Sequence, residues 1–243
     1  FNDHKFKKNF HLGSVNSINW ARILAQIVYY FYAWSRVAKD IRERVSFVVP
    51  TGNFGNVLAG YYAKLMGLPI DKLIVGTNEN DILHRFFSRG EYNSKKVIET
   101  LSPSMDIQIS SNFERQIFES LNNDSDAVNK IMDMLDKNDH YIFDNQIQSR
   151  FQEIYKSYSV TNEKTLDTIK IFNSQYNYLA DPHTATGLSV LHENNYDHPV
   201  ISLACAHPSK FGNAIKKSID IDILLPKVLE NIFDKKENMH ILN

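Results

Sequence analysis

The sequence is poor in cysteine and carries almost no net charge, and each scarcity excludes a class of protein. One cysteine, Cys205, excludes a disulfide framework and any zinc site that needs several thiolates, and it fits a reducing compartment such as the cytoplasm. The 27 Lys and Arg residues nearly balance the 28 Asp and Glu residues. Because no bulk charge attracts the chain to nucleic acid or to an anionic membrane surface, we expect neither as a partner.

Several catalytic and targeting signatures are also missing. The 9 histidines show neither an HExxH pattern nor clustered spacing, so no metal site is expected. No serine stands in a G-x-S-x-G turn, which argues against an α/β-hydrolase. The chain starts at Phe1 without an initiator methionine, an apolar signal region or a transit pattern, and we interpret it as a segment of a longer protein.

What is present is the composition of an ordinary globular protein. Of the 243 residues, 43% are hydrophobic and 23% are charged. A chain of this length removes roughly 70–75% of its extended surface from water, which is enough for a substantial core. The most apolar stretch, residues 16–39, has helical periodicity, and we expect it to be buried between other elements. Its polar residues Asn19, Arg22 and Gln26 exclude a membrane span.

The order of the elements predicts an α/β fold with a partial parallel sheet flanked by helices. An apolar strand over residues 45–50 is followed by a glycine turn, a helix over 57–66 and a second strand over 73–76. This order forms a βαβ unit, in which the two strands are parallel. A third strand is expected over 199–204, so the sheet is incomplete. Further helices are expected over residues 81–88, 113–121, 126–135, 162–176 and 181–191.

The glycine turn carries the best local signal for a binding site. It comprises Thr51, Gly52, Asn53, Phe54, Gly55 and Asn56. Glycines allow the backbone to approach an anion, and the free N–H groups at the start of the next helix favour a phosphate. The turn lacks the third glycine of a dinucleotide fingerprint and the lysine of a Walker P-loop. The alternative is a strand-to-helix turn in which glycine serves the backbone geometry alone.

Two further polar clusters have both a functional and a structural interpretation. In residues 110–115, Arg115 can bind a phosphate or a carboxylate, whereas Ser110 or Ser111 can cap a helix with Glu114 completing a capping box. In residues 181–187, His183 and Thr184 stand where a loop enters a helix that proline can start. For Cys205, at a strand end, we favour a small core residue over a nucleophile.

Together these segments resemble threonine synthases, in the longer branch of that family. The resemblance covers most of residues 13–211, and the tail from residue 225 to 243 also resembles the family's C-terminus. It rests on ordered blocks, which are GSVNSINWARI (13–23), VPTGNFGN (49–56), KLMGLP (64–69), TNENDIL (77–83), SPSMDI (102–107), SSNFER (110–115), DPHTA (181–185) and AHPSKF (206–211).

The resemblance implies a type II pyridoxal-phosphate-enzyme fold and conversion of O-phospho-L-homoserine and water to L-threonine and phosphate. Residues 52–56 would bind the phosphate of the cofactor, pyridoxal 5'-phosphate, and Thr184 would hydrogen-bond its pyridine nitrogen. The candidates for the substrate phosphate or carboxylate are Asn112, Arg115, Lys210 and the edge formed by Asn16, Asn19 and Arg22.

The resemblance also implies how the chain is divided. Residues 1–78 would belong to the cofactor-binding domain and carry the phosphate loop. Residues 79–176 would form a mostly helical segment specific to the family, and residues 177–243 would return to the cofactor-binding domain.

One departure from the family is large. The Schiff-base lysine of the family stands in a Phe-Lys-Asp type of block upstream of the matched region, and no such block occurs here. That lysine is the covalent anchor of the cofactor. We therefore expect this chain to be the C-terminal part of a threonine synthase, to need the missing N-terminal part, and to be inactive alone. The alternatives are a non-catalytic relative that binds a phosphorylated metabolite or cofactor, and a structural half.

Overall fold

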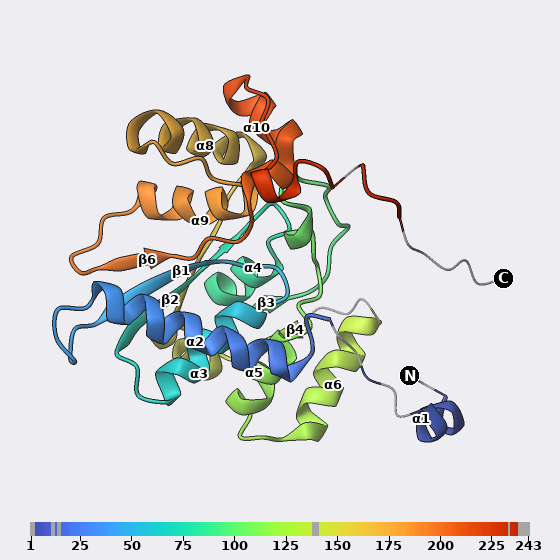
Figure 1. Ribbon diagram of the computed structural model, residues 1–243. Helices are drawn as coiled ribbons and strands as arrows, with labels where there is room; N and C mark the ends of the chain where they lie inside the picture. The colour runs from blue at the N-terminus through green and yellow to red at the C-terminus, as the bar shows by residue number, and fades with distance from the viewer. Residues whose placement is uncertain (1–2, 11–12, 14–15, 138–140, 233, 238–243) are drawn as a thin grey trace.

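The computed structural model describes residues 3–10, 13, 16–137, 141–232 and 234–237 (Figure 1). Parts of the matched blocks, at residues 14–15 and at the end of the tail, lie outside the described residues. The first elements in the chain are α1 (His4–Phe10), α2 (Trp20–Val37), β1 (Val45–Pro50), α3 (Gly55–Leu65), β2 (Ile70–Thr77) and α4 (Ile82–Arg89).

The centre of the molecule is a four-stranded sheet with the strand order β5-β2-β1-β6, in which every pairing is parallel. The two outer strands are β5 (Tyr155–Ser159) and β6 (Val200–Ser202). All six residues of β1 are buried, because helices cover both faces of the sheet. The expected parallel α/β architecture is therefore confirmed.

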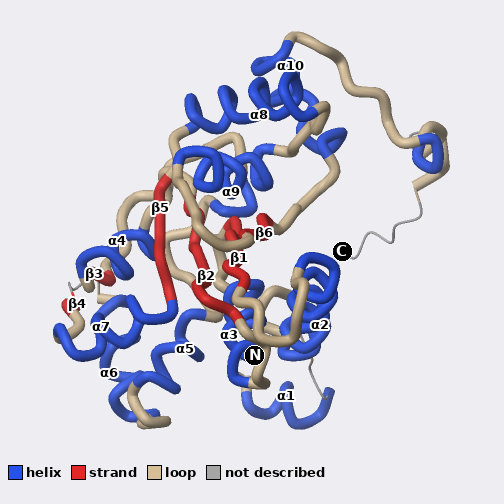
Figure 2. Tube along the Cα trace, turned by 90° about the vertical axis from the view of Figure 1, so that its left-hand side faces the viewer, coloured by secondary structure: helices blue, strands red, loops and turns tan. Residues whose placement is uncertain are grey.

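Alternate residues of the central strands face different helices. Phe47 and Val49 of β1 pack into a cluster with α2 and α3, whereas Val48 packs with Ile74 of β2 and Val190 on the opposite face. That opposite face is covered by α9 (Pro182–Glu193), with α8 (Asn162–Tyr176) packed outside it (Figure 2). The third helix of this layer, α10 (Gly212–Ile219), packs on α8.

The segment between the second and third expected strands is less purely helical than expected. It contains the predicted helices as α5 (Phe113–Ser120) and α6 (Ser125–Asp136), but it also contributes β5 to the main sheet. It holds a second, two-stranded antiparallel sheet as well. The remaining elements are β3 (Glu91–Tyr92), η1 (Pro103–Met105), β4 (Tyr141–Ile142), α7 (Asn145–Ile154), η2 (Pro208–Phe211) and η3 (Lys227–Leu229).

The apolar helix α2 is less covered than its composition indicates. Ile23, Ile27 and Tyr30 are buried against α3 and β1, but Val28 and Tyr32 are 62% and 67% exposed. The expectation that α2 is buried between other elements was wrong for this side, because the described residues cover only the stripe that faces the sheet. The helix begins at Trp20, where the side chain of Asn19 accepts a hydrogen bond from the amide of Ala21.

Candidate functional site

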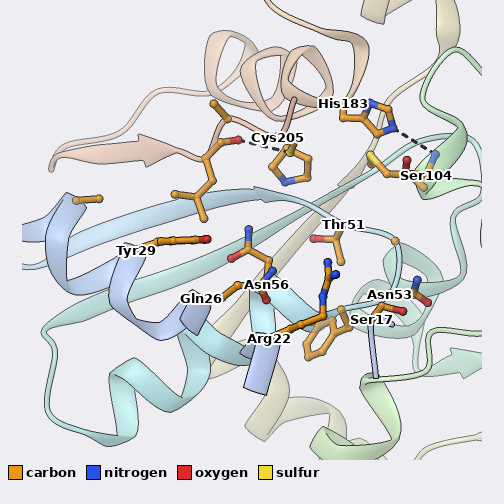
Figure 3. A pocket seen from close by; sticks show the side chains of 18 of the residues that line it. Ser17, Arg22, Gln26, Tyr29, Thr51, Asn53, Asn56, Ser104, His183 and Cys205 are labelled. Carbon is orange, nitrogen blue, oxygen red and sulfur yellow. Dashed lines mark hydrogen bonds between the residues drawn. The ribbon is translucent and has the colours of Figure 1, made fainter. Parts of the chain in front are cut away.

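A cavity of about 630 Å³ opens at the carboxyl ends of β1 and β6 (Figure 3). Ligands of parallel α/β proteins bind at this end of the sheet, where loops and helix starts converge. Five segments meet here, namely α2, the turn after β1, the turn at η1, the start of α9 and the chain after β6. The glycine turn of residues 51–56 forms one wall.

The glycine turn presents unsatisfied amides to this cavity. Phe54 adopts the left-handed conformation at φ 61°, and its ring is buried in the core, so the backbone reverses sharply before α3. No side chain caps α3. Within the described part of the chain, the amides of Gly55, Asn56 and Val57 have no acceptor, and the first amide bonded at this helix start is that of Leu58. Free N–H groups at the positive end of a helix dipole form an anion site.

Residues 110–112 hold this turn in place. The Ser110 hydroxyl donates to the Gly52 carbonyl at 2.8 Å, and the Ser111 hydroxyl donates to Asn53 Oδ1 at 3.2 Å. The amide of Asn112 donates to the Asn53 carbonyl at 3.2 Å. The structural interpretation, in which Ser110 or Ser111 caps α5, is wrong, since these hydroxyls bond the glycine turn and the N-cap position, Asn112, makes no side-chain cap bond.

Glycine is required at position 52 because another segment lies against it. A Cβ there would stand 3.0 Å from both Met105 Cα and the Ser104 carbonyl oxygen, which are backbone atoms. At Gly55 a Cβ would stand 3.2 Å from Nδ2 of Asn112. A side chain at either position would therefore force its neighbour to shift by a few tenths of an ångström, and at Gly52 that neighbour is backbone.

Asn56 has a buried polar atom without a partner at the same wall. Its Oδ1 is inaccessible to solvent and makes no hydrogen bond in the described structure. Its carbonyl accepts a hydrogen bond of 2.7 Å from the hydroxyl of Tyr30, whose burial raises its pKa well above the ordinary value. An orphaned acceptor of this kind needs a hydrogen-bond donor, such as a water molecule or an N–H or O–H group of a ligand.

The start of α9 is organised by Asp181. Its carboxylate caps the helix by accepting from the amides of His183 and Thr184, and it also accepts from the imidazole Nδ1 of His183 at 3.0 Å. Burial acts to raise the pKa of Asp181, but the hydrogen bonds from His183 and Thr184 outweigh it and the pKa is lowered.

Thr184 lies behind the cavity wall rather than in it. Its hydroxyl donates to Asp181 Oδ2 and accepts from the Cys205 amide at 2.8 Å. It is buried and is not among the residues that line the cavity, whereas His183 and Cys205 are. The role of Thr184 toward a pyridine nitrogen stays a prediction.

Cys205 was expected to be a small core residue, which is wrong, because it is exposed at the cavity wall. Desolvation by the surrounding wall and the charge of Asp181 raise the pKa of its thiol to about 12. Such a thiol is protonated at neutral pH and is a poor nucleophile.

The structure does not place three of the substrate candidates, Asn112, Arg115 and Lys210, in the lining of the cavity. The Arg115 guanidinium donates to Asn112 Oδ1 at 2.5 Å and to the Ile18 carbonyl at 2.9 Å, and it lines a separate cavity of about 310 Å³. Asn112 is buried and donates to the Ser17 carbonyl at 2.8 Å. Lys210 lies over the ring of Phe211 at 5.8 Å. Among the described residues, Arg22 on α2, which belongs to the candidate edge of Asn16, Asn19 and Arg22, does line the cavity.

Sequence reasoning gave little weight to three other residues that line the cavity, Gln26, Tyr29 and Ser104. Gln26 and Tyr29 stand one and two helical turns after Arg22, so the helical period predicts that the three share a side of α2. Ser104 had no local signal, because a tertiary contact places its turn. No group of three or more His, Cys, Asp or Glu residues suited to a metal ion occurs among the described residues. The described helices include none long and apolar enough to cross a membrane.

Comparison with known proteins assigns relatives to the whole chain. The family model described as threonine synthase, C-terminal, matches residues 184–243. The chain is 42% identical over 245 residues to the threonine synthase of Pseudomonas aeruginosa, covering 100% of this chain and 52% of the relative. It is 46% identical over 240 residues to that of Saccharomyces cerevisiae, covering 90% and 46%. The chain thus spans about half the length of the curated relatives it matches.

Solved structures agree with this relationship. The pyridoxal-phosphate-bound threonine synthase from Brucella melitensis superposes with a TM-score of 0.93 at 44% identity, over 100% of this chain and 52% of that one. A pyridoxal 5'-phosphate-dependent aspartate racemase superposes with a TM-score of 0.54 at 11% identity, over 83% of this chain and 54% of that one, which shows a shared fold alone. The expected type II fold is confirmed.

Proposed function

Because the chain belongs to the threonine synthase family over the half of those enzymes that it spans, we propose that it is the C-terminal half of such an enzyme. The reaction is the conversion of O-phospho-L-homoserine and water to L-threonine and phosphate, with pyridoxal 5'-phosphate as cofactor. One observation carries the proposal, namely that Gly55 and Asn56, whose amides have no acceptor among the described residues, line a cavity of about 630 Å³.

The residues at the glycine turn fit a phosphorylated cofactor. The amides of Gly55, Asn56 and Val57 supply unused donors, Gly52 and Asn53 bring the backbone close, and Phe54 fixes the reversal of the chain. Pyridoxal phosphate, when bound, withdraws electrons from an amino-acid substrate through its pyridine ring. On this proposal Thr184 hydrogen-bonds the pyridine nitrogen, which requires its hydroxyl to turn away from Asp181.

The substrate anion is bound by Arg22, and Asn112 and Arg115 support this contact indirectly. Arg22 lines the cavity, and its guanidinium makes no hydrogen bond or ion pair with the described residues. Asn112 and Arg115 bond the carbonyls of Ser17 and Ile18, which directly precede α2. They orient the helix that carries Arg22. Lys210, at the end of η2, is a weaker candidate for a substrate carboxylate.

The lysine that anchors the cofactor comes from outside this chain. No lysine is among the described residues that line the cavity. The proposal therefore keeps the division expected from the resemblance. Residues 1–78 and 177–243 build the cofactor site, residues 79–176 form the segment between them, and the part of the relatives that this chain does not span supplies the lysine.

The test joins this chain to the N-terminal half of the Brucella melitensis enzyme and measures release of phosphate and formation of threonine from O-phospho-L-homoserine. Both products are expected, and a Gly55→Val form of the same protein is expected to make neither. Binding of pyridoxal phosphate without turnover would favour the non-catalytic relative, and absence of both would contradict the proposal.

A further inference from the structure

The turn formed by residues 102–106, which contains η1, lies over the glycine turn and is built from backbone contacts. The carbonyl of Ser104 and the Cα of Met105 lie where a side chain at position 52 would stand. Ser104 lines the cavity (Figure 3). Within the described ranges its hydroxyl makes no hydrogen bond, so it is available to a ligand in the cavity.

The base of this turn is fixed by Asp106. Its carboxylate accepts hydrogen bonds from the hydroxyl and the amide of Thr100 at 2.6 and 2.9 Å and from the side-chain amide of Asn78 at 2.8 Å. The side-chain amide of Asn80 adds another at 3.1 Å. These contacts anchor the end of the turn that lies away from Ser104.

The end of the turn nearer the cavity is held by His183. The Ser104 amide donates to the His183 imidazole Nε2 at 3.2 Å. On the other side of the ring, Oδ1 of Asp181 accepts from the imidazole Nδ1 at 3.0 Å. The ring of Phe211 lies against the imidazole with the centroids 4.7 Å apart. Because one ring nitrogen faces a carboxylate and the other accepts from an amide, the imidazole is neutral with its proton on Nδ1.

We infer that His183, oriented by Asp181, is a positioning residue that holds the 102–106 turn so that the Ser104 hydroxyl donates to the anion bound at the glycine turn. This inference rests on the proposed function for the identity of the anion, a phosphate ester. It assigns a task to His183, which is buried although it lines the cavity. The backbone contact between Gly52 and Ser104 places the two turns side by side, and both line the same cavity.

The experiment uses four variants of this chain, each joined to the N-terminal half of the Brucella melitensis enzyme as in the test of the proposed function. His183→Leu removes the acceptor, His183→Gln keeps an acceptor at the end of a side chain of similar reach, and Ser104→Ala removes the hydroxyl but leaves the amide. His192→Leu, at the exposed far end of the same helix, is the control. Hydrogen exchange of the Ser104 amide reports the position of the turn, and calorimetric titration with pyridoxal phosphate reports binding.

The expected results distinguish the role of His183, which holds the turn, from that of Ser104, which contacts the ligand. His183→Leu speeds exchange of the Ser104 amide about tenfold and weakens pyridoxal phosphate binding about tenfold, as loss of one hydrogen bond implies. His183→Gln restores most of the slow exchange of the Ser104 amide and most of the affinity for pyridoxal phosphate. Ser104→Ala weakens binding to the same degree and leaves exchange unchanged, and His192→Leu changes neither.

Unchanged exchange in His183→Leu, or unchanged binding in Ser104→Ala, would overturn the inference. If the unmodified joined protein binds no pyridoxal phosphate, the proposed function and the role of Ser104 both fail, while the exchange result still decides the role of His183. Should His183→Leu not fold, the nitrogen spectrum of His183 in the unmodified chain decides, because a proton on Nε2 excludes the contact with the Ser104 amide.

Discussion

Gly60→Ala tests the packing beneath the candidate site. Gly60 lies in the middle of α3, where it faces α2 and β2. A Cβ at this position would stand 2.6 and 2.7 Å from two ring carbons of Tyr30 and 2.8 Å from a methyl carbon of Leu73. Tyr30 and Leu73 are both fully buried, and the hydroxyl of Tyr30 is bonded to the Asn56 carbonyl, so neither side chain can yield easily.

Two opposing effects determine the magnitude. In an exposed helix interior, replacing glycine by alanine stabilises a protein by about 1 kcal/mol. Overpacking a tight core costs about 1–3 kcal/mol, and three contacts below 3.0 Å place Gly60 near the upper end of that range. The free energy of unfolding is therefore expected to fall by about 1–2 kcal/mol.

Urea unfolding monitored by circular dichroism measures this change, with Gly212→Ala as the matched control. Gly212 begins α10, and a Cβ there would meet nothing within 4 Å, so the control is expected to be neutral or slightly stabilising. A Gly60→Ala protein that equals or exceeds the unmodified chain in stability would refute the packing argument.

Three further predictions concern the site itself. Gly55→Val is expected to weaken pyridoxal phosphate binding at least about tenfold with the melting temperature nearly unchanged, because the side chain enters the space next to Asn112 and the free amides. Calorimetric titration measures the binding and thermal melting measures the stability. Retained binding would mean that the turn has a purely structural role. Thr184→Val is expected to shift the absorbance spectrum of the bound cofactor. It is also expected to lower the free energy of unfolding by about 1–3 kcal/mol, since the Cys205 amide loses its acceptor. An unaltered spectrum would place Thr184 outside the site. The lowered pKa of Asp181 means that its stabilisation is present above its unfolded pKa of about 3.9 and is lost as the pH falls through the folded value. Asp181→Asn is therefore expected to be less stable at pH 7 and to lose less stability between pH 5 and pH 2, and unfolding curves as steeply pH-dependent as those of the unmodified chain would contradict this.

The parts of the fold that the sequence predicts are those with strong local signals. The run at residues 45–50 is apolar except for Ser46 because it is buried on both faces, and the glycine turn follows it directly. The strand β5 was missed because it lies at the edge of the sheet and reads Tyr-Lys-Ser-Tyr-Ser, with one buried residue in five. Its pairing with β2 depends on contacts that no local pattern records.

The same distinction applies to the site. The free amides at residues 55–57 follow from the order strand, glycine turn, helix, and the structure places them at a cavity. Arg115 looked like an anion-binding residue because its chemistry suits that role, yet its guanidinium is engaged by Asn112 and the Ile18 carbonyl. Residue type predicts what a side chain can bind, whereas its partner depends on which segments the fold brings together.

The most direct test of the central claim compares pyridoxal phosphate with pyridoxal, which differs only in lacking the phosphate, in calorimetric titrations of this chain joined to the N-terminal half of the Brucella melitensis enzyme. If the amides of Gly55, Asn56 and Val57 bind the phosphate, pyridoxal phosphate is expected to bind at least about a hundredfold more tightly, because charge-assisted hydrogen bonds contribute about 1.5–3 kcal/mol each. Equal affinities for the two compounds would contradict the claim that the glycine turn is a phosphate site.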